Sequence, residues 1–590
     1  MKVTLAKISF ALSSAITIFL MVMPAHAQST IRTDQKYIEA IKKSKEVTPI
    51  GVDSFGDHLD LSSGSVEFKW TDIDVPGNSS LPVRLQRSLV VEDKYLTSAA
   101  DLGGFGAAGS LDVPYLKGVF SSSGGWQVTG DSPNARCSMY AGPPSYDEIG
   151  APDYWSGNSM HIPWAGDHAM LSSPASALPK MSGAAPIITK DFWAFKCLSS
   201  TQNGYPGEGF VAISPEGDKY YFDWVVTKSY PAISKRYGNY AHSTQFLSRV
   251  QVYFLATRIE DRFGNWVNYT YVGDKLQKIT ASDGRFIQVD SWNGDNIASV
   301  SSSIGNWSYA YDTNSMTTTQ PDGSHWQYVS TGALRVEPIP SLPLYDPNLT
   351  VNGQPTCPAP ELSSGDYSLA VTPPSGATAT YTFTVVRHFK SNVPRMCNAF
   401  IDDSLMSYRY LTIPNFSDTL TLVSKSIAGP GLPAMGWTYS YSDKGALAFE
   451  DVCADPPTPL ACPTTKTTEV RGPNATYKRY TFGNMFNETS GQLMELEEGS
   501  ETGTPPNSQV VINRTTTYDY VVDGDLASEP FPGQVGSTGS SHFDNAVMSL
   551  LRPLKQKQIT LDGRTFTNSV GAFDVFGRPT EVTKSSAPSP

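Results

Sequence analysis

A strand–turn–strand pattern that recurs from about residue 250 onward constrains the fold of this chain more than any other feature. In its clearest copy, residues 266–271 read WVNYTY and residues 275–280 read KLQKIT, with Gly273 and Asp274 between them. Alternating apolar and polar residues are typical of half-buried strands, and a short Gly/Asp connection is typical of a hairpin turn. A single hairpin is only marginally stable in water, so repeated hairpins must pair in a shared sheet. The sequence therefore predicts an all-β fold of irregular stacked hairpins.

Weaker copies of this pattern lie in residues 287–300 and 307–328, fragments of it stand at 516–520 and 562–566, and the last clear copy is 573–583. Their irregular spacing indicates a loose repeat of hairpins. The composition agrees, because 48 Gly, 43 Pro and 29 Tyr accompany only 17% charged residues. Such a chain is too poor in charge for a coiled coil and suits short strands joined by tight turns.

Turn chemistry divides the rest of the chain. Residues 51–250 alternate with period two, as in VEFKWTDI at 66–73, and predict an N-terminal β-rich region. The predicted segments are a short helix and linker at 28–50 (the helix over 35–45), the β-rich region at 51–250 with a loop insertion at 141–186, repeats at 251–335, a β-rich insertion at 336–450, and repeat-like hairpins at 451–590.

Residues 1–27 have the organisation of a signal peptide. Lys2 and Lys7 precede an apolar run over residues 8–23, and Ala25-His26-Ala27 gives the small-x-small pattern of a cleavage site. The alternative is a membrane anchor, but the run is short for a spanning helix and ends at Pro24. We therefore expect an exported protein, in the periplasm, secreted or on the cell surface, with no membrane association after cleavage.

Six cysteines, all beyond residue 27, agree with an oxidising compartment. They allow 15 pairings, of which pairing of neighbours is the simplest. A zinc site is disfavoured because no CxxC occurs and no His has ligand spacing from a cysteine pair. His161 and His168, in MHIPWAGDH, are interpreted as surface-loop histidines. The candidate disulfide cysteines are Cys137, Cys197, Cys357, Cys397, Cys453 and Cys462.

No pattern in the chain predicts a catalytic residue, a metal site or a cofactor. The net charge of −12 argues against nucleic-acid binding, which needs a basic surface. Gly104, Gly106 and Gly109 match a dinucleotide-binding spacing, but no βαβ unit surrounds them, so we expect a loop. Carboxylate groups that a glycosidase could use lie among turn residues, where Asp bonds its own backbone. These acids are Asp53, Asp57, Asp60, Asp72 and Asp74.

The tyrosine-rich hairpins with Asp-Gly-Arg and Asp-x-x-Gly-Arg turns resemble the RHS (YD-repeat) proteins of bacteria. The region upstream is similar to the one that precedes such repeats in exported members, for example in YWSGN at 154–158 and YTFGN at 480–484. The residues that match the repeat motif are Asp261, Gly264, Tyr269, Tyr271, Gly273, Leu276, Asp283, Gly284, Arg285, Asp574, Gly577 and Arg578.

The resemblance implies a non-enzymatic, exported protein that forms part of a β-walled shell around a C-terminal effector, which this chain does not include. Its partners would be a C-terminal RHS segment or a toxin cargo. One alternative is an adhesin that holds cell-surface glycans on exposed aromatic rings. The competing interpretation is that these rings pack across strands inside the sheet. A secreted glycosidase is the third hypothesis. The aromatic residues concerned are Tyr269, Tyr271, Trp307, Tyr309 and Tyr311.

Overall fold

The structure is a computed structural model, and it describes only part of the chain. The described residues are 55–91, 102–147, 149–155, 157–163, 165–172, 186–189, 191–237, 243–332, 334, 350–351, 354–355, 365–389, 391, 397–401, 407–411, 416–442, 463–485, 489–503, 508–521, 552–574 and 578–588. The expected signal peptide and the helix over 35–45 lie outside these residues. Among the described residues, no helix has the length and apolar character needed to cross a membrane.

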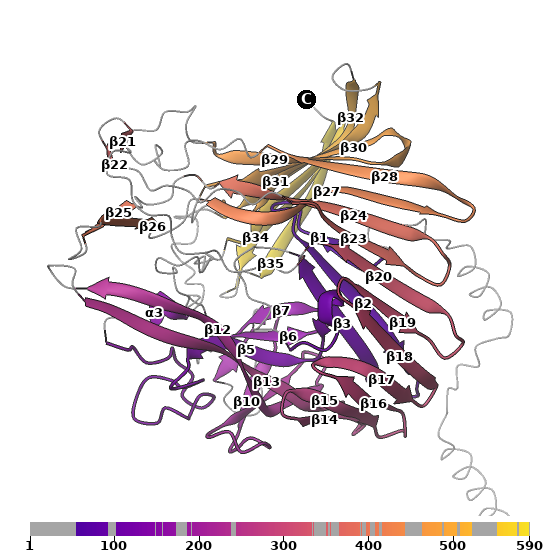
Figure 1. The fold of residues 1–590 in the computed structure, drawn as a ribbon. Coiled ribbons are helices and arrows are strands. Elements are labelled where there is room, and N and C mark those ends of the chain that lie inside the picture. Colours follow the sequence, from indigo (N-terminus) through magenta and orange to yellow (C-terminus); the bar gives the residue numbers. More distant parts are fainter. Residues whose placement is uncertain are drawn as a thin grey trace, which may run out of the picture. The chain divides into compact units, whose positions relative to one another are not determined.

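Strands make up most of the described residues, which confirms the all-β prediction (Figure 1). Helical structure in the described part is limited to single turns, α3 (Ala151–Tyr154), η2 (Gly106–Ala108) and η3 (Pro473–Ala475). The strands of the first half are β1 (Asp57–Leu59), β2 (Val66–Asp74), β3 (Arg84–Val91), β4 (Ser110–Leu111), β5 (Tyr115–Ser121), β6 (Ser159–Ile162), β7 (Gly166–Ala169), β8 (Leu171–Ser172), β9 (Ile187–Ile188), β10 (Ala194–Leu198), β11 (Gly209–Ile213), β12 (Lys219–Tyr237), β13 (Ser243–Glu260), β14 (Trp266–Val272), β15 (Lys275–Ala281), β16 (Phe286–Asn293) and β17 (Asn296–Ser302).

The second half continues in the same way with β18 (Gly305–Asp312), β19 (Ser315–Thr319), β20 (His325–Thr331), β21 (Thr350–Val351), β22 (Gln354–Pro355), β23 (Tyr367–Thr372), β24 (Thr378–Phe389), β25 (Cys397–Ile401), β26 (Ser407–Leu411), β27 (Phe416–Gly429), β28 (Leu432–Tyr441), β29 (Thr465–Arg471), β30 (Thr476–Gly483), β31 (Leu493–Thr502), β32 (Gln509–Tyr520), β33 (Leu554–Leu561), β34 (Arg564–Phe573) and β35 (Pro579–Pro588).

One long antiparallel sheet follows the chain from β13 to β35. Each strand pairs with the next one in sequence, except that β20 pairs with β23 and β24 with β27. The pairs β21–β22 and β25–β26 form separate two-stranded sheets. Strand β13 carries β12 on one edge, while its other edge pairs first with β5 and then with β14. Strands β23, β24, β27 and β28, which lie within the expected insertion at 336–450, thus continue the sheet.

The segment expected to be a loop insertion at 141–186 also contains regular structure. Helix α3 and strands β6, β7 and β8 lie within it, and β6 pairs with β5. These strands are only two to four residues long. Runs of this length are too short to show a clear period of two, so the sequence pattern does not reveal the strands. The many Pro and Gly residues around them therefore favour the prediction of a loop.

The hairpin turns form where the sequence predicts them. Asp261 ends β13 with a turn in which its Oδ1 accepts the backbone N–H groups of Phe263 and Asn265. Gly264 in this turn has φ +87° and Gly284 in the β15–β16 turn has φ +90°, a conformation that disfavours residues with a Cβ atom. The turn structure therefore explains the Asp and Gly of the motif, because the aspartate accepts hydrogen bonds within the turn and the glycines adopt positive φ.

The long sheet has one face that is largely buried, which we call the covered face. It carries Tyr309, Tyr328, Tyr381, Lys425 and Thr468, which alternate along their strands with more exposed residues. Tyr269, Tyr271, Trp307 and Tyr309 are all buried on it, and Tyr311 donates its hydroxyl to the carbonyl of Ile297. The packing interpretation of these aromatic residues is confirmed, so they do not present rings to a ligand.

Candidate functional site

The N-terminal sheet β1–β4 packs against the covered face of the long sheet. Aromatic rings of this sheet and of the loop before β4 contact tyrosines on alternate strands of that face. Phe105 contacts Tyr309, Trp70 contacts Tyr328 and Phe68 contacts Tyr381, all at ring-centroid distances of 4.8–5.5 Å. The contacts extend to β29, where Thr468 Oγ1 donates a hydrogen bond to the Leu61 carbonyl. Period-two patterning on both sheets produces this interface, because each sheet must bury its apolar face.

A buried ion pair joins the two sheets at the centre of this interface. Lys425 Nζ, on β27, lies 2.7 Å from Asp57 Oδ2, on β1, and their side chains are 0% and 4% exposed. Tyr381 donates its hydroxyl to the other carboxylate oxygen at 2.7 Å. Burial raises the pKa of Tyr381 well above its usual value, and the Asp57 charge raises it further. The tyrosine therefore remains a hydrogen-bond donor, and the Asp57 carboxylate has a partner on both oxygens.

A second buried cation, Arg87 on β3, lies between the sheets. Its Nε is 3.0 Å from Asp72 Oδ2, and its Nη1 donates to the Ala108 carbonyl. The guanidinium lies over two rings that contact each other edge to face, 4.3 Å from the Trp70 centroid and 4.1 Å from that of Tyr328. Burial would lower the pKa of Arg87, but the charge and hydrogen bond of Asp72, together with Tyr328 and Tyr309, outweigh it and the net shift is upward. The arginine therefore stays charged beside the aromatic rings.

Arg285, a residue of the repeat motif, connects one hairpin turn to the N-terminal sheet. Its Nε pairs with Asp283 in the same turn, at 2.8 Å. Its Nη1 donates to the Val75 carbonyl and its Nη2 to the Leu81 carbonyl. The Asp-Gly-Arg turn thus has a specific role here, because its arginine satisfies carbonyl groups of the covering sheet.

The other arginine of the motif acts within its own turn. Arg578 Nε donates to Asp574 Oδ2 at 2.6 Å, and its guanidinium lies over the ring of Phe192. Gly577 lies outside the described residues. Gly273 forms the β14–β15 turn with φ +60°, and Leu276 is fully buried on β15. The motif residues are therefore spread over turns and core, and they do not converge on one site.

Three of the five candidate carboxylates, those of Asp57, Asp72 and Asp74, lie on strands and not in turns as expected. Asp74 is exposed and pairs with Arg84 on the neighbouring strand. Asp57 and Asp72 lie on strands, are buried, and pair with Lys425 and Arg87. The expectation failed because their partners lie far away in the sequence or on the neighbouring strand, where no local pattern reveals them. Asp60 does lie in a turn, where it accepts hydrogen bonds from Ser62 and Ser63. Asp53 is outside the described residues.

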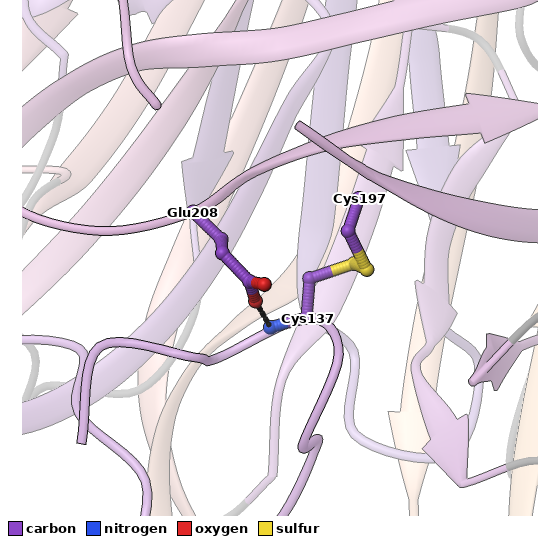
Figure 2. A group of neighbouring side chains, drawn as sticks. All are labelled: Cys137, Cys197 and Glu208. Atoms are coloured by element: carbon purple, nitrogen blue, oxygen red, sulfur yellow. Dashed lines mark hydrogen bonds between the residues drawn. A yellow bond between two sulfur atoms is a disulfide. The ribbon is translucent and has the colours of Figure 1, made fainter. Parts of the chain in front are cut away.

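Cys137 and Cys197 form a disulfide next to Glu208 (Figure 2). This is the pairing of neighbours for these two cysteines. Glu208 Oε2 accepts the backbone N–H groups of Cys137 and Ser138, each at 2.9 Å. The two sulfur atoms and the carboxylate lie close enough to hold a metal ion, but both sulfurs are used in the disulfide. Cys357, Cys453, Cys462 and the side chain of Cys397 lie outside the described part.

Removal of this disulfide should destabilise the N-terminal region. The bridge spans 60 residues of sequence, so we expect the Cys137→Ser/Cys197→Ser variant to lose about 2–4 kcal/mol of unfolding free energy. Urea unfolding followed by tryptophan fluorescence measures this loss. A reductant should lower the midpoint of the wild-type protein and leave the variant unchanged. Equal midpoints for the oxidised wild type and the variant would contradict the prediction.

His161 lies in a charged cluster on β5–β7, and the prediction that it is a surface-loop histidine is wrong. It is a buried residue of β6, with Nε2 2.7 Å from Asp112 Oδ1 and Nδ1 2.7 Å from Asp167 Oδ1. Lys117 pairs with the second oxygen of Asp167 at 2.7 Å. His168, on β7, also pairs with a carboxylate, that of Asp191. The Asp residues that partner His161 lie six and 49 positions away, too irregular for a recognisable motif.

The environment of His161 favours the imidazolium form. Burial alone would lower the pKa of His161, but hydrogen bonds and charges from Asp112 and Asp167 outweigh it and raise the pKa. Burial would likewise raise the pKa of Asp167, yet His161 and Lys117 hold it well below its usual value. With both ring nitrogens bound to carboxylates, His161 has no nitrogen left to act as a general base. The cluster is therefore suited to stabilising the fold.

This cluster predicts a dependence of stability on pH. Because the folded-state pKa of His161 is raised, its contribution is complete below the unfolded value of about 6.5 and is lost as pH rises through the folded value. The difference in unfolding free energy between wild type and His161→Phe should therefore shrink from about pH 6 to pH 9. Urea unfolding at several pH values measures it, with the exposed His325→Phe as control. A constant difference would contradict the prediction.

The glycine-rich segment at 104–109 forms a loop, as expected. Gly104 accepts a backbone hydrogen bond from Ile297, on β17, and residues 106–108 form η2. The carbonyl of Ala108 is the one that Arg87 binds. The segment thus positions a buried arginine and has none of the strand–loop–helix context of a dinucleotide site.

No family model matches this chain, and no curated protein matches it either. The described residues bring together buried cations, carboxylates and aromatic rings at the interface of two sheets. Sequence reasoning missed Arg87 and Lys425. The available signal was a charged residue at a core position of an alternating strand, as in TLTLVSKSI at 419–427.

Proposed function

We propose that this chain is an exported, non-enzymatic scaffold of the RHS-repeat type, which forms part of a β-walled shell around an effector polypeptide. The observation that carries the proposal is the covered face. The hairpins from β14 to β35 present one continuous face, and a second sheet is anchored on it by the buried Asp57–Lys425 ion pair and by Arg87 over the Tyr328 ring. In a sheet built by adding hairpins in sequence order, further strands can pair with the last strand, and other segments can pack on its face.

Several features support a scaffold over the adhesin and glycosidase hypotheses. The five aromatic residues that an adhesin would display are buried or hydrogen-bonded within the core. Of the candidate glycosidase carboxylates, Asp57 and Asp72 are held in buried ion pairs. The disulfide and the N-terminal signal pattern agree with an exported protein.

Co-expression tests the proposal. The mature chain, residues 28–590, would be produced in a bacterial periplasm together with each polypeptide encoded beside its gene. We expect a stoichiometric complex with a polypeptide that carries RHS repeats or an effector domain, detected by size-exclusion chromatography with light scattering. The same chain would be tested on glycan arrays. Glycan binding without any such complex would overturn the scaffold and favour the adhesin.

A further inference from the structure

The covered face continues beyond the N-terminal sheet onto the last strands of the long sheet. One row of direct cross-strand partners runs over eight strands without a register shift at these positions. Its members are Tyr441, Thr468, Tyr480, Leu496, Thr516, Ile559, Phe566 and Ser586. The first residues of the row lie where the N-terminal sheet packs, and the last lie on β33–β35. The same side of the sheet is therefore covered at one end and reaches the surface at the other.

Exposure of apolar side chains on this face rises sharply at its end. Tyr439 on β28 is 5% exposed, whereas Phe566 on β34 is 43% exposed and Val582 on β35 is 48% exposed. Leu561 on β33 is 37% exposed. Register places all three apolar residues on the covered face. A sheet face with exposed apolar residues at core positions is the kind of surface that another layer buries.

This end of the covered face is also basic. Three adjacent rows on β32–β35 include four cations and no Asp or Glu. Their members are Arg514, Leu561, Arg564 and Pro588, then Thr516, Ile559, Phe566 and Ser586, then Tyr518, Lys557, Asn568 and Lys584. Arg514 is paired with Glu498 on β31, and Lys557 lies over the Tyr518 ring. The positive charge is notable because the whole chain has a net charge of −12.

The opposite face of the same strands differs in character. Its corresponding rows contain only neutral residues, which are Thr515, Thr560, Thr565 and Ala587, and Thr517, Gln558, Thr567 and Ser585. The cations are thus concentrated on one side of the sheet and are not a general property of its surface.

The covered part of the face shows which chemistry matches such a surface. At β27, the sheet supplies the cation Lys425, and the covering layer supplies the carboxylate of Asp57. Around this pair, the covering layer adds the apolar rings of Phe68 and Trp70. At β33–β35 the sheet again presents cations among apolar side chains, as it does at Lys425. Its complement is a polypeptide layer that carries carboxylates among apolar residues.

We propose that the covered face of β33–β35 docks an acidic polypeptide segment of a partner, through Lys557, Arg564 and Lys584 around Phe566. This inference rests on the proposed scaffold role, for which it names the chemistry of the partner. A polypeptide fits better than a nucleic acid or an anionic polysaccharide, because exposed Leu561, Phe566 and Val582 need apolar side chains to bury them.

Peptide binding tests the surface directly. The probe is a labelled synthetic peptide that alternates Glu and Val, and its neutral control alternates Gln and Val. Fluorescence anisotropy with the mature chain should show binding of the acidic peptide, weakened by salt, and little binding of the neutral one. The Lys557→Gln/Arg564→Gln/Lys584→Gln variant should bind the acidic peptide at least about tenfold more weakly.

Matched variants separate this surface from general charge effects. The control Lys196→Gln/Arg262→Gln/Lys278→Gln removes the same charge elsewhere and should bind like wild type. Phe566→Ala should weaken binding severalfold, whereas Phe263→Ala, at an exposed hairpin turn, should not. Circular dichroism and urea midpoints establish that each variant is folded.

Equal binding of the two peptides would overturn the proposal, and so would unchanged binding of the acidic peptide by the triple variant at β33–β35. A third contrary result is that polygalacturonate or single-stranded DNA displaces the acidic peptide while Phe566→Ala has no effect on its binding. That result would indicate a general polyanion surface. If the acidic peptide does not bind but the co-expressed complex still forms, the docking role of β33–β35 is wrong and the scaffold role stands. Peptide binding without any such complex overturns the scaffold role.

Discussion

Replacement of Lys425 by Ala is expected to lower the free energy of unfolding by about 3–5 kcal/mol. The reason is that Asp57, which is 4% exposed, would keep its buried charge without its cation. The interface between the two sheets would lose its central contact, so the N-terminal sheet should be the first part to detach. Urea unfolding measures the loss, and hydrogen exchange of β1–β3 shows where it occurs.

A triple variant distinguishes this account from simple loss of packing. Asp57→Leu/Tyr381→Phe/Lys425→Met replaces the ion pair by apolar groups of similar size and leaves no buried hydroxyl without its acceptor, and such replacements are commonly neutral or stabilising. We expect its unfolding free energy to recover to near the wild-type value. A Lys425→Ala variant within about 1 kcal/mol of wild type would show that the buried pair does not anchor the interface.

The second large effect is expected at Arg87. Its side chain is fully buried, pairs with Asp72, and lies over the rings of Trp70 and Tyr328, so Arg87→Ala should cost about 3–5 kcal/mol. Arg87→Lys keeps the charge but loses the planar group that stacks and the second hydrogen bond. We therefore expect Arg87→Lys to recover only part of the loss, as measured by urea unfolding.

The same two strands provide the matched control for Arg87. Arg84 pairs with Asp74 across β2 and β3, but their side chains are 41% and 50% exposed. Solvent screens an exposed pair, so Arg84→Ala should cost less than about 1 kcal/mol. Similar losses at Arg84 and Arg87 would mean that burial between the sheets is not the source of the effect.

Local sequence patterns were sufficient to predict the hairpins but not the interface between the sheets. Gly273, Gly284 and the turn aspartate Asp261 act within a few residues of their position, so a short window of sequence contains their whole environment. Asp57 and Lys425 are separated by 368 positions, and nothing near either residue indicates the other. His161 was misinterpreted for the same reason, because Asp112 is its partner across strands.

The extent of the sheet was underestimated for a different reason. Strands β23–β28 have the same alternation as the repeats, but a long Pro-rich stretch separates them from β20 in sequence. The sequence change at 336 suggested an insertion, while the register of β20 with β23 continues the sheet across it. Strand pairing depends on hydrogen bonds between distant segments, and a break in local composition does not preclude them.

Hydrogen exchange of the mature chain, alone and in complex with a co-expressed partner, tests the central claim most directly. If the chain is a scaffold whose covered face receives further polypeptide, amides of β33–β35 should exchange more slowly in the complex, while those of β14–β20 should not change. Unchanged exchange at β33–β35 in a stable complex, or the failure of any neighbouring polypeptide to form one, would contradict the account.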